Sequence, residues 1–334
     1  MNKTNKEAIF PIASLFIDEN EIFSENYKKA KALYDDHKYA RSLKLALQII
    51  NKDNLNSSIE NLLTNYLIAS IYYATHNNKN ALNYYKATLI CLEKYNDSIL
   101  KVDFNKGNKI YFDKDYITSE TLLNYGNCFF RLNIKENVES FKDSALYYYF
   151  KVDLVKSSQN SVLDVKSKAY NNISGIYMND SLYDKAKEFA YKSIIIHKKL
   201  NNKVNEAAAL GNLSSIYLLE NNFNEAKKIY FEALDLIRNL KTTKAVKVKE
   251  DLYYNLAYNL YKLKDYEAYN FQELSYKIKD SLRDNEFRAM ISEITEKYNF
   301  DVKKNLLLKE AENKQLINQR TFWLFGIGSF IVIV

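Results

Sequence analysis

Residues 168–194 read KAYNNISGIYMNDSLYDKAKEFAYKSI, and residues 208–234 read AALGNLSSIYLLENNFNEAKKIYFEAL. The two stretches align without gaps at an offset of 40 residues. Each consists of an apolar-patterned run, a short polar turn and a second such run, as expected of two helices joined by a turn. Self-similarity at a fixed period indicates an architecture in which one structural unit stacks on the next. The two stretches therefore predict helix hairpins that repeat along the chain.

Small residues recur where the two predicted helices of a hairpin must approach each other. Ser174 aligns with Ser214 in the first helix, and Ala186 aligns with Ala226 in the second. Helices pack closely only where side chains at the contact are small, and a large aromatic one turn later would fill the space between neighbouring hairpins. The predicted packing residues, over all copies of this pattern, are Ala69, Tyr72, Ala81, Gly126, Phe129, Ser174, Tyr177, Ala186, Ser214, Tyr217, Ala226, Tyr230 and Ala233.

The composition favours helices over sheets. Among 334 residues there are only 6 Gly and 1 Pro, whereas sheet-rich folds need turn residues every 8–12 positions. The net charge of +7 comes from basic residues that are interleaved with acidic ones along the chain. Because no basic run resembles a nucleic-acid recognition arm, we expect a solvated surface and no direct contact with nucleic acid.

Residues that could support catalysis or metal binding are few and scattered. The 3 histidines, His37, His76 and His197, have no second His, Cys or carboxylate at ligand spacing. The 2 cysteines, Cys91 and Cys128, lie in apolar stretches and are expected to be buried thiols. Gly-rich phosphate loops and nucleophile motifs are missing from the sequence. We therefore expect no enzymatic activity, no metal and no cofactor.

The repeat resembles the tetratricopeptide repeat family. The best copy matches the family pattern at Leu213, Ser214, Tyr217, Ala226, Tyr230 and Ala233. The resemblance covers residues 24–281, about six hairpins, and implies an all-α solenoid, a right-handed superhelix of helix hairpins. The family's frequent Trp and Pro are missing, and the period of about 40 instead of 34 predicts helices roughly half a turn to one turn longer than usual. An insert at 96–115 is either a small β-hairpin or a long loop.

Membership of this family would imply a function in binding proteins or peptides. Arrays of this kind bind extended peptides or helices in a groove lined by the first helix of each hairpin. Tyrosine rings can grip a partner at low entropic cost, and asparagine amides can hold a peptide backbone. The groove residues that the resemblance selects are Tyr66, Tyr73, Asn127, Phe130, Asn171, Met178, Tyr254, Tyr258 and Tyr261.

The C-terminal part has a different character. Residues 282–320 carry a stripe of apolar residues at helical spacing, which predicts one long amphipathic helix that caps the array and continues as a stalk. Residues 321–334, TFWLFGIGSFIVIV, carry no charge. A helix that spans a membrane needs ~20 apolar residues, so we expect a partial transmembrane segment. At the other end, residues 1–23 resemble a poor signal peptide.

The order of repeat array, stalk and apolar segment resembles the sensor portion of membrane-bound signalling proteins of Bacteroidetes type. Those proteins continue into a histidine kinase or a regulator of LuxR or AraC type. The resemblance implies a single-pass protein of the bacterial inner membrane, with a peptide or protein ligand in the groove and a stalk that can pair with a second copy. The side of the membrane on which the array lies stays open. Two alternatives also stay open: a membrane-anchored adaptor without signalling output, and a fragment of an intracellular peptide-responsive transcriptional regulator.

Overall fold

The computed structural model describes residues 17–18, 24–50, 58–94, 99–104 and 108–283, and the helical residues 306, 308–310, 312–315 and 317. The chain divides into two compact units, Met1–Ser275 and Tyr276–Val334. Nearly all described residues belong to the first unit.

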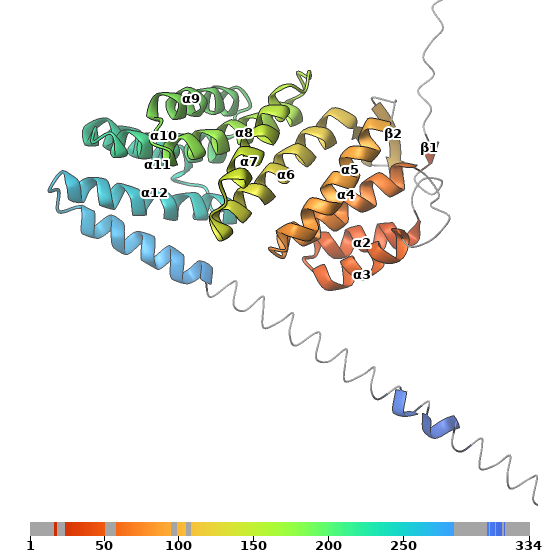
Figure 1. Cartoon of the computed structure of the whole chain (residues 1–334). Coiled ribbons are helices and arrows are strands. Elements are labelled where there is room, and N and C mark those ends of the chain that lie inside the picture. Colours follow the sequence, from red (N-terminus) through yellow and green to blue (C-terminus); the bar gives the residue numbers. More distant parts are fainter. Residues whose placement is uncertain are drawn as a thin grey trace, which may run out of the picture. The chain divides into compact units, whose positions relative to one another are not determined.

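The first unit consists of helix hairpins stacked in sequence order (Figure 1). The hairpins are α2 (Glu25–Asp35) with α3 (Tyr39–Ile50), α4 (Ser58–Ala74) with α5 (Asn78–Lys94), α6 (Lys114–Glu136) with α7 (Glu139–Asp153), α8 (Asn160–Asn179) with α9 (Tyr183–Lys199), α10 (Lys203–Leu219) with α11 (Phe223–Ile237), and α12 (Thr243–Lys262) with the helical run that begins at residue 268. Each helix contacts its own partner and the adjacent hairpin, and the first helices of successive hairpins contact one another. The predicted helical repeat fold is confirmed for this part of the chain.

The predicted small residues lie at the hairpin interfaces. Ser174 and Ala186 are fully buried, and the Ser174 hydroxyl donates to the Ala186 carbonyl over 2.8 Å. In the first hairpin the bond runs in the opposite direction, because Ser42 of the second helix α3 donates to the Ala30 carbonyl of α2 over 2.7 Å. Among the other predicted packing residues, Ala69, Ala81, Gly126, Ser214, Ala226, Tyr230 and Ala233 are buried, while Tyr72, Phe129, Tyr177 and Tyr217 are partly buried.

The turns inside the hairpins use residues other than glycine in the left-handed backbone conformation. The residue after the C-cap of each first helix adopts a left-handed conformation in five hairpins, at His37, His76, Ser181, Asn221 and Lys264. Around Ser181, the Leu182 N–H donates to the Tyr177 carbonyl over 2.9 Å and the Ser181 N–H donates to Met178 over 3.1 Å. This is the Schellman pattern, in which glycine is the usual left-handed residue. In this protein the left-handed position is occupied by residues with a side chain, for which that backbone conformation is less favourable than for glycine.

The insert between the second and third hairpins is a β-hairpin, the first of the two predicted alternatives. Strands β2 (Ile99–Phe104) and β3 (Asn108–Asp113) pair antiparallel, with Ile99 opposite Asp113. Strand β1 (Ile17–Asp18) pairs parallel to β2 and completes a three-stranded sheet. The array itself is all-α as predicted, and the short strands at the insert form a small sheet beside it. Asp113 then caps α6 by accepting from the N–H groups of Asp115 and Tyr116.

Several predicted segments lie mostly outside the described residues. These are the N-terminal segment 1–23, the stalk over 282–320 and the apolar segment 321–334. Within the part of the chain that the structure describes, none of the helices combines the length and the apolar character needed to cross a membrane. The stalk and the membrane segment stay predictions.

Candidate binding face

The residues predicted to line a groove lie on the first helices α4, α6, α8 and α12. We use the name first-helix face for the side of these helices, and of α10 between them, that carries the predicted residues. Successive first helices contact each other, so the face continues from one hairpin to the next. Its side chains differ greatly in how much of them is available to a ligand.

Asparagine amides link three first helices across this face. The Asn172 side chain in α8 donates to the Asn127 amide oxygen in α6 over 2.8 Å. The Asn212 side chain in α10 donates to the Asn171 amide oxygen in α8 over 2.9 Å. The Tyr149 hydroxyl from α7 also donates to the Asn127 oxygen, over 2.8 Å. The Asn127 oxygen thus accepts two hydrogen bonds within the array. The hydrogen bond between Asn212 and Asn171 uses only the Asn212 nitrogen and the Asn171 oxygen, so the other amide atom of each residue is not engaged by it.

The two predicted tyrosines of α4 are also engaged within the array. The Arg131 guanidinium from α6 lies 3.7 Å from the centre of the Tyr73 ring and donates to the Tyr73 carbonyl over 3.0 Å. Burial raises the pKa of Tyr73, and the Arg131 charge opposes the rise. Burial and the neighbouring Glu120 carboxylate raise the pKa of Tyr66. Phe130 and Met178 are partly buried and pack against the core. These four side chains hold neighbouring hairpins together.

The tyrosines of α12 are the most available predicted residues. Tyr254, Tyr258 and Tyr261 are 51%, 48% and 68% exposed. The Lys262 ammonium lies 5.2 Å from the centre of the Tyr258 ring, so this end of the face combines aromatic surface with a positive charge. Exposed tyrosines at helical spacing offer rigid contact area with hydroxyl groups at the rim.

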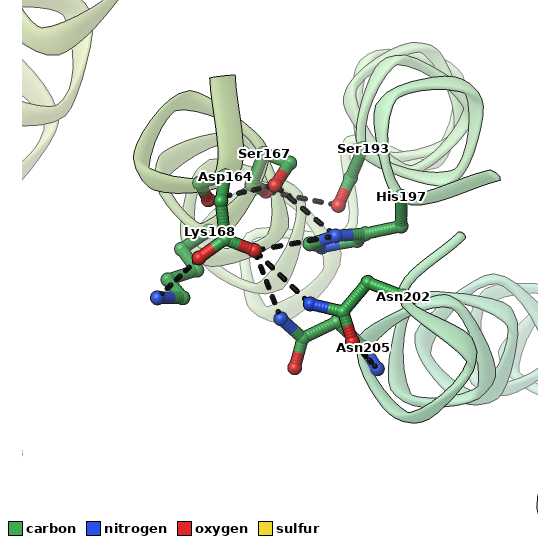
Figure 2. A network of polar contacts seen from close by, with 7 residues as sticks. All are labelled: Asp164, Ser167, Lys168, Ser193, His197, Asn202 and Asn205. Carbon is green, nitrogen blue, oxygen red and sulfur yellow. Dashed lines mark hydrogen bonds and ion pairs between the residues drawn. The ribbon is translucent and has the colours of Figure 1, made fainter. Parts of the chain in front are cut away.

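The structure also contains a partly buried polar network that the sequence did not reveal (Figure 2). It joins α8, α9 and α10 around Asp164 and His197. The Asp164 carboxylate pairs with Lys168 over 2.7 Å and accepts from the side chains of Asn202 and Asn205, each over 3.2 Å. The His197 Nδ1 lies 3.9 Å from this carboxylate. Burial opposes ionisation of Asp164, but Lys168, His197 and Asn205 together lower its pKa.

The Ser167 hydroxyl lies 3.3 Å from His197 Nδ1, which gives the network a Ser, a His and an Asp in one place. The geometry is nevertheless unlike that of a catalytic triad. The Ser167 hydroxyl gives its proton to the Asp164 carbonyl over 2.8 Å, so Nδ1 must carry the proton that it shares with Ser167. In a triad the nucleophile and the acid contact opposite ring nitrogens. Here both contact Nδ1, and Ser167 is fully buried.

The remaining candidate chemistry is sparse. The Cys128 thiol is fully buried, and burial raises its pKa to about 12. The Cys91 thiol is partly buried and has its pKa raised by the same cause. No cluster of three His, Cys, Asp or Glu side chains able to hold a metal occurs among the described residues.

Comparison with known proteins agrees with this geometry. Residues 166–239 match the tetratricopeptide repeat family. No curated protein matches the chain. Among solved structures, BtubC from P. vanneervenii is 13% identical, with a TM-score of 0.51, 78% of this chain covered and 93% of that one. The apo form of RapI is 12% identical, with a TM-score of 0.50 and coverages of 78% and 75%.

A third similar structure is NprR in complex with its cognate peptide NprX. It is 16% identical, with a TM-score of 0.51, and the alignment covers 76% of this chain and 65% of NprR. At such identities the likeness shows the fold alone. Residues 166–239 are tetratricopeptide repeats, and helix hairpins of the same geometry continue on both sides of them.

Proposed function

We propose that this protein is a scaffold that binds an extended peptide segment of a partner on its first-helix face. The observation that carries the proposal is the amide pair of Asn171 and Asn212. Their mutual hydrogen bond uses the Asn171 oxygen and an Asn212 N–H. Within the described residues, no other hydrogen bond engages the Asn171 nitrogen or the Asn212 oxygen. A donor and an acceptor side by side complement the C=O and N–H groups of a peptide backbone.

Two further features support peptide binding. The exposed tyrosines of α12 offer aromatic contact area on the same series of first helices. NprR, which has the same fold, has been crystallised with a peptide bound. An extended peptide leaves its backbone groups unpaired, so the amides could anchor the peptide while the tyrosines contribute contact area.

The experiment selects binders from a phage-displayed library of random dodecapeptides on the whole chain. Asn171→Ala and Asn212→Ala should each weaken the selected peptides about 10-fold, because each removes one backbone anchor. Asn224→Ala, in the second helix α11 and exposed, is the matched control and should leave affinity unchanged. Thermal unfolding of each variant separates lost binding from lost folding. Failure to select any peptide that the native chain binds would overturn the proposal.

We further propose that the array is the sensor module of a membrane-tethered signal transducer, held at the membrane by residues 321–334. The support is the sequence alone: a charged amphipathic run that leads from the last hairpin into an uncharged apolar segment. Binding on the array would then bias the stalk. An adaptor without output and a fragment of an intracellular regulator remain the alternatives.

Cell fractionation tests the tether. The whole chain should partition with membranes, and a variant lacking 321–334 should not. Equal distribution of the two forms would exclude the tether and favour the intracellular regulator. Cross-linking between the stalks of two copies distinguishes a signalling sensor from an adaptor without output. If ligand binding leaves cross-linking between stalk residues of two copies unchanged, no signal passes along it.

A further inference from the structure

In three hairpins the second helix carries a tyrosine at the same position of the repeat, and its ring packs against the first helix. The Tyr149 hydroxyl of α7 donates to Asn127 of α6 over 2.8 Å. The Tyr230 hydroxyl of α11 lies 2.9 Å from the Ser215 hydroxyl of α10. All three tyrosines, the third being Tyr85 of α5, are fully buried. In the α4–α5 hairpin the aligned residues are Ser70 and Tyr85. There the Ser70 hydroxyl donates to the Tyr66 carbonyl over 2.8 Å, and the buried Tyr85 hydroxyl has no hydrogen-bond partner among the described residues.

The α8–α9 hairpin lacks both members of this pair. The aligned residues are Gly175 in α8 and Ala190 in α9, separated by 15 positions like Ser215 and Tyr230. A methyl group at Gly175 would meet no atom within 4 Å. In the α6–α7 hairpin the residue aligned with Gly175 is Asn127, which accepts from the Tyr149 hydroxyl over 2.8 Å. The preceding Gly126 aligns with Ser174, and a methyl group there would lie 2.7 Å from the Tyr149 ring. Among the four hairpins from α4–α5 to α10–α11, only α8–α9 carries no tyrosine at this place, which leaves Gly175 open.

The open position adjoins the amide pair on which the proposed function rests. Asn171 lies one helical turn before Gly175 and Met178 lies almost one turn after it, on the same side of α8. Asn212 is held beside Asn171 by their hydrogen bond. None of these side chains carries a charge. The nearest charged groups along this side of α8 are Lys168 and Asp164, which are paired with each other.

We propose that a side chain of the bound peptide enters the first-helix face at Gly175, and that this side chain is uncharged. The inference rests on the proposed function, since it identifies where the peptide lies. A peptide whose backbone is anchored by Asn171 and Asn212 has its next side chain within reach of the open space. A charged side chain would lie beside the uncharged Asn171, Asn212 and Met178, and along this side of α8 the nearest charges, Lys168 and Asp164, are already paired with each other. An amide, a hydroxyl or an aliphatic group would be accepted.

The test uses the dodecapeptides selected on the whole chain and measures their affinity for three variants. Gly175→Leu fills the open position and should weaken binding at least about 10-fold, and Gly175→Ala should weaken it less. Gly175→Ala should not lower the unfolding temperature, because nothing lies within 4 Å of the added methyl group and glycine is a poor helix former. The unfolding temperature of Gly175→Leu is measured alongside, so that a loss of binding can be separated from a loss of folding. Ser140→Leu adds the same side chain to an exposed site on α7, a second helix, and should leave binding unchanged.

A second variant fills the same space from the opposite helix. Ala190→Tyr restores the tyrosine found in three other hairpins, and it should weaken binding as Gly175→Leu does if its fold is intact. The peptides should also tolerate uncharged residues at one position and lose affinity when Lys or Glu is placed there. Unchanged affinity of the selected peptides for Gly175→Leu would overturn this inference while leaving the proposed function standing. A chain that selects no peptide would instead overturn the proposed function.

Discussion

His197 in α9 occupies the core position that Ile237 occupies in α11, 40 residues further along the repeat. The two side chains are 2% and 0% exposed, and Leu92 holds the same position in α5. A histidine therefore stands where two other hairpins, α4–α5 and α10–α11, place an aliphatic residue. Burial lowers the His197 pKa to about 4, with the Asp164 carboxylate opposing and the Lys168 and Lys244 charges adding to the effect. The ring is neutral at pH 7.

His197→Leu should raise the free energy of unfolding at pH 7 by about 1 kcal/mol. The variant restores the side chain that the repeat uses elsewhere, and replacing buried polar groups by apolar ones of similar volume is often stabilising. Asp164 keeps its partners Lys168, Asn202 and Asn205, so no buried group is orphaned. Urea denaturation measures the change. A loss of more than about 1 kcal/mol would show that the network stabilises this junction more than a leucine can.

The native chain should lose stability as the pH falls from about 6.5 towards about 4, and His197→Leu should lose less over this window. The unfolded chain binds a proton at His197 near pH 6.5, whereas the folded chain does so only near pH 4. Above pH 6.5 both states are neutral at this site and no penalty arises. Allowing for partial solvent screening, the difference between the two proteins should reach about 2 kcal/mol. Parallel unfolding curves at pH 7 and pH 4.5 decide the matter.

The hairpin packing could be predicted because its determinants are local and repeated. Ser174 and Ala186 lie within one repeat, and their copies at an offset of 40 residues show the same pattern a second time within the sequence itself. The polar network could not be predicted in the same way. Asp164 and His197 are 33 positions apart and have no counterpart in the next repeat, where Ile237 gives no hint of a polar partner.

The candidate binding face was only partly predictable. The resemblance selected Asn127 and Asn171 equally, but the Tyr149 hydroxyl and Asn172 occupy the first, whereas the second keeps a free amide nitrogen within the described residues. That difference depends on which second helix carries a tyrosine. The sequence signal for the open position was present, since Gly175 and Ala190 break a series of polar residues and tyrosines. This signal can be interpreted only once α8 and α9 are known to pack together as one hairpin.

Gly126→Ala and Gly175→Ala form a matched pair with opposite expected effects. Gly126→Ala places a methyl group 2.7 Å from the Tyr149 ring and 3.3 Å from the Ala145 carbonyl, and both neighbours are buried. It should lower the free energy of unfolding by about 1–3 kcal/mol through overpacking. Gly175→Ala should raise it by about 0.5–1 kcal/mol, because alanine favours the helix. Equal effects of the two changes, measured by urea denaturation, would contradict the packing described here.

Lys264→Gly should stabilise the protein by about 1 kcal/mol. Lys264 has a φ of 58°, in the left-handed region that costs a residue with a side chain about 1–2 kcal/mol. Asn221→Gly, at a φ of 62°, should gain less because asparagine tolerates this region. Lys262→Gly, in the last turn of α12, is the control and should destabilise. Thermal unfolding of the three variants should rank them in this order, and a destabilised Lys264→Gly would show that the side chain itself stabilises the turn.

Tyr149 and Asn127 should prove energetically coupled, since the tyrosine hydroxyl donates to the amide oxygen within the array. Tyr149→Phe removes only the hydroxyl, so Asn127 still accepts from Asn172 and the cost should be about 1 kcal/mol. Asn127→Ala should cost more, because it leaves a buried hydroxyl and the Asn172 amide without this acceptor.

The double variant should then cost less than the sum of the two single changes by about 1 kcal/mol, since residues in one hydrogen-bond network are not additive. Tyr149→Phe combined with Asn224→Ala supplies the control, because Asn224 is exposed on α11 and should add independently. Additivity of Tyr149→Phe and Asn127→Ala in urea denaturation would mean that the tyrosine stabilises the hairpin through its ring alone. The hydroxyl would then contribute nothing to stability. The absence of such a tyrosine from the α8–α9 hairpin would then not explain why the position at Gly175 is open.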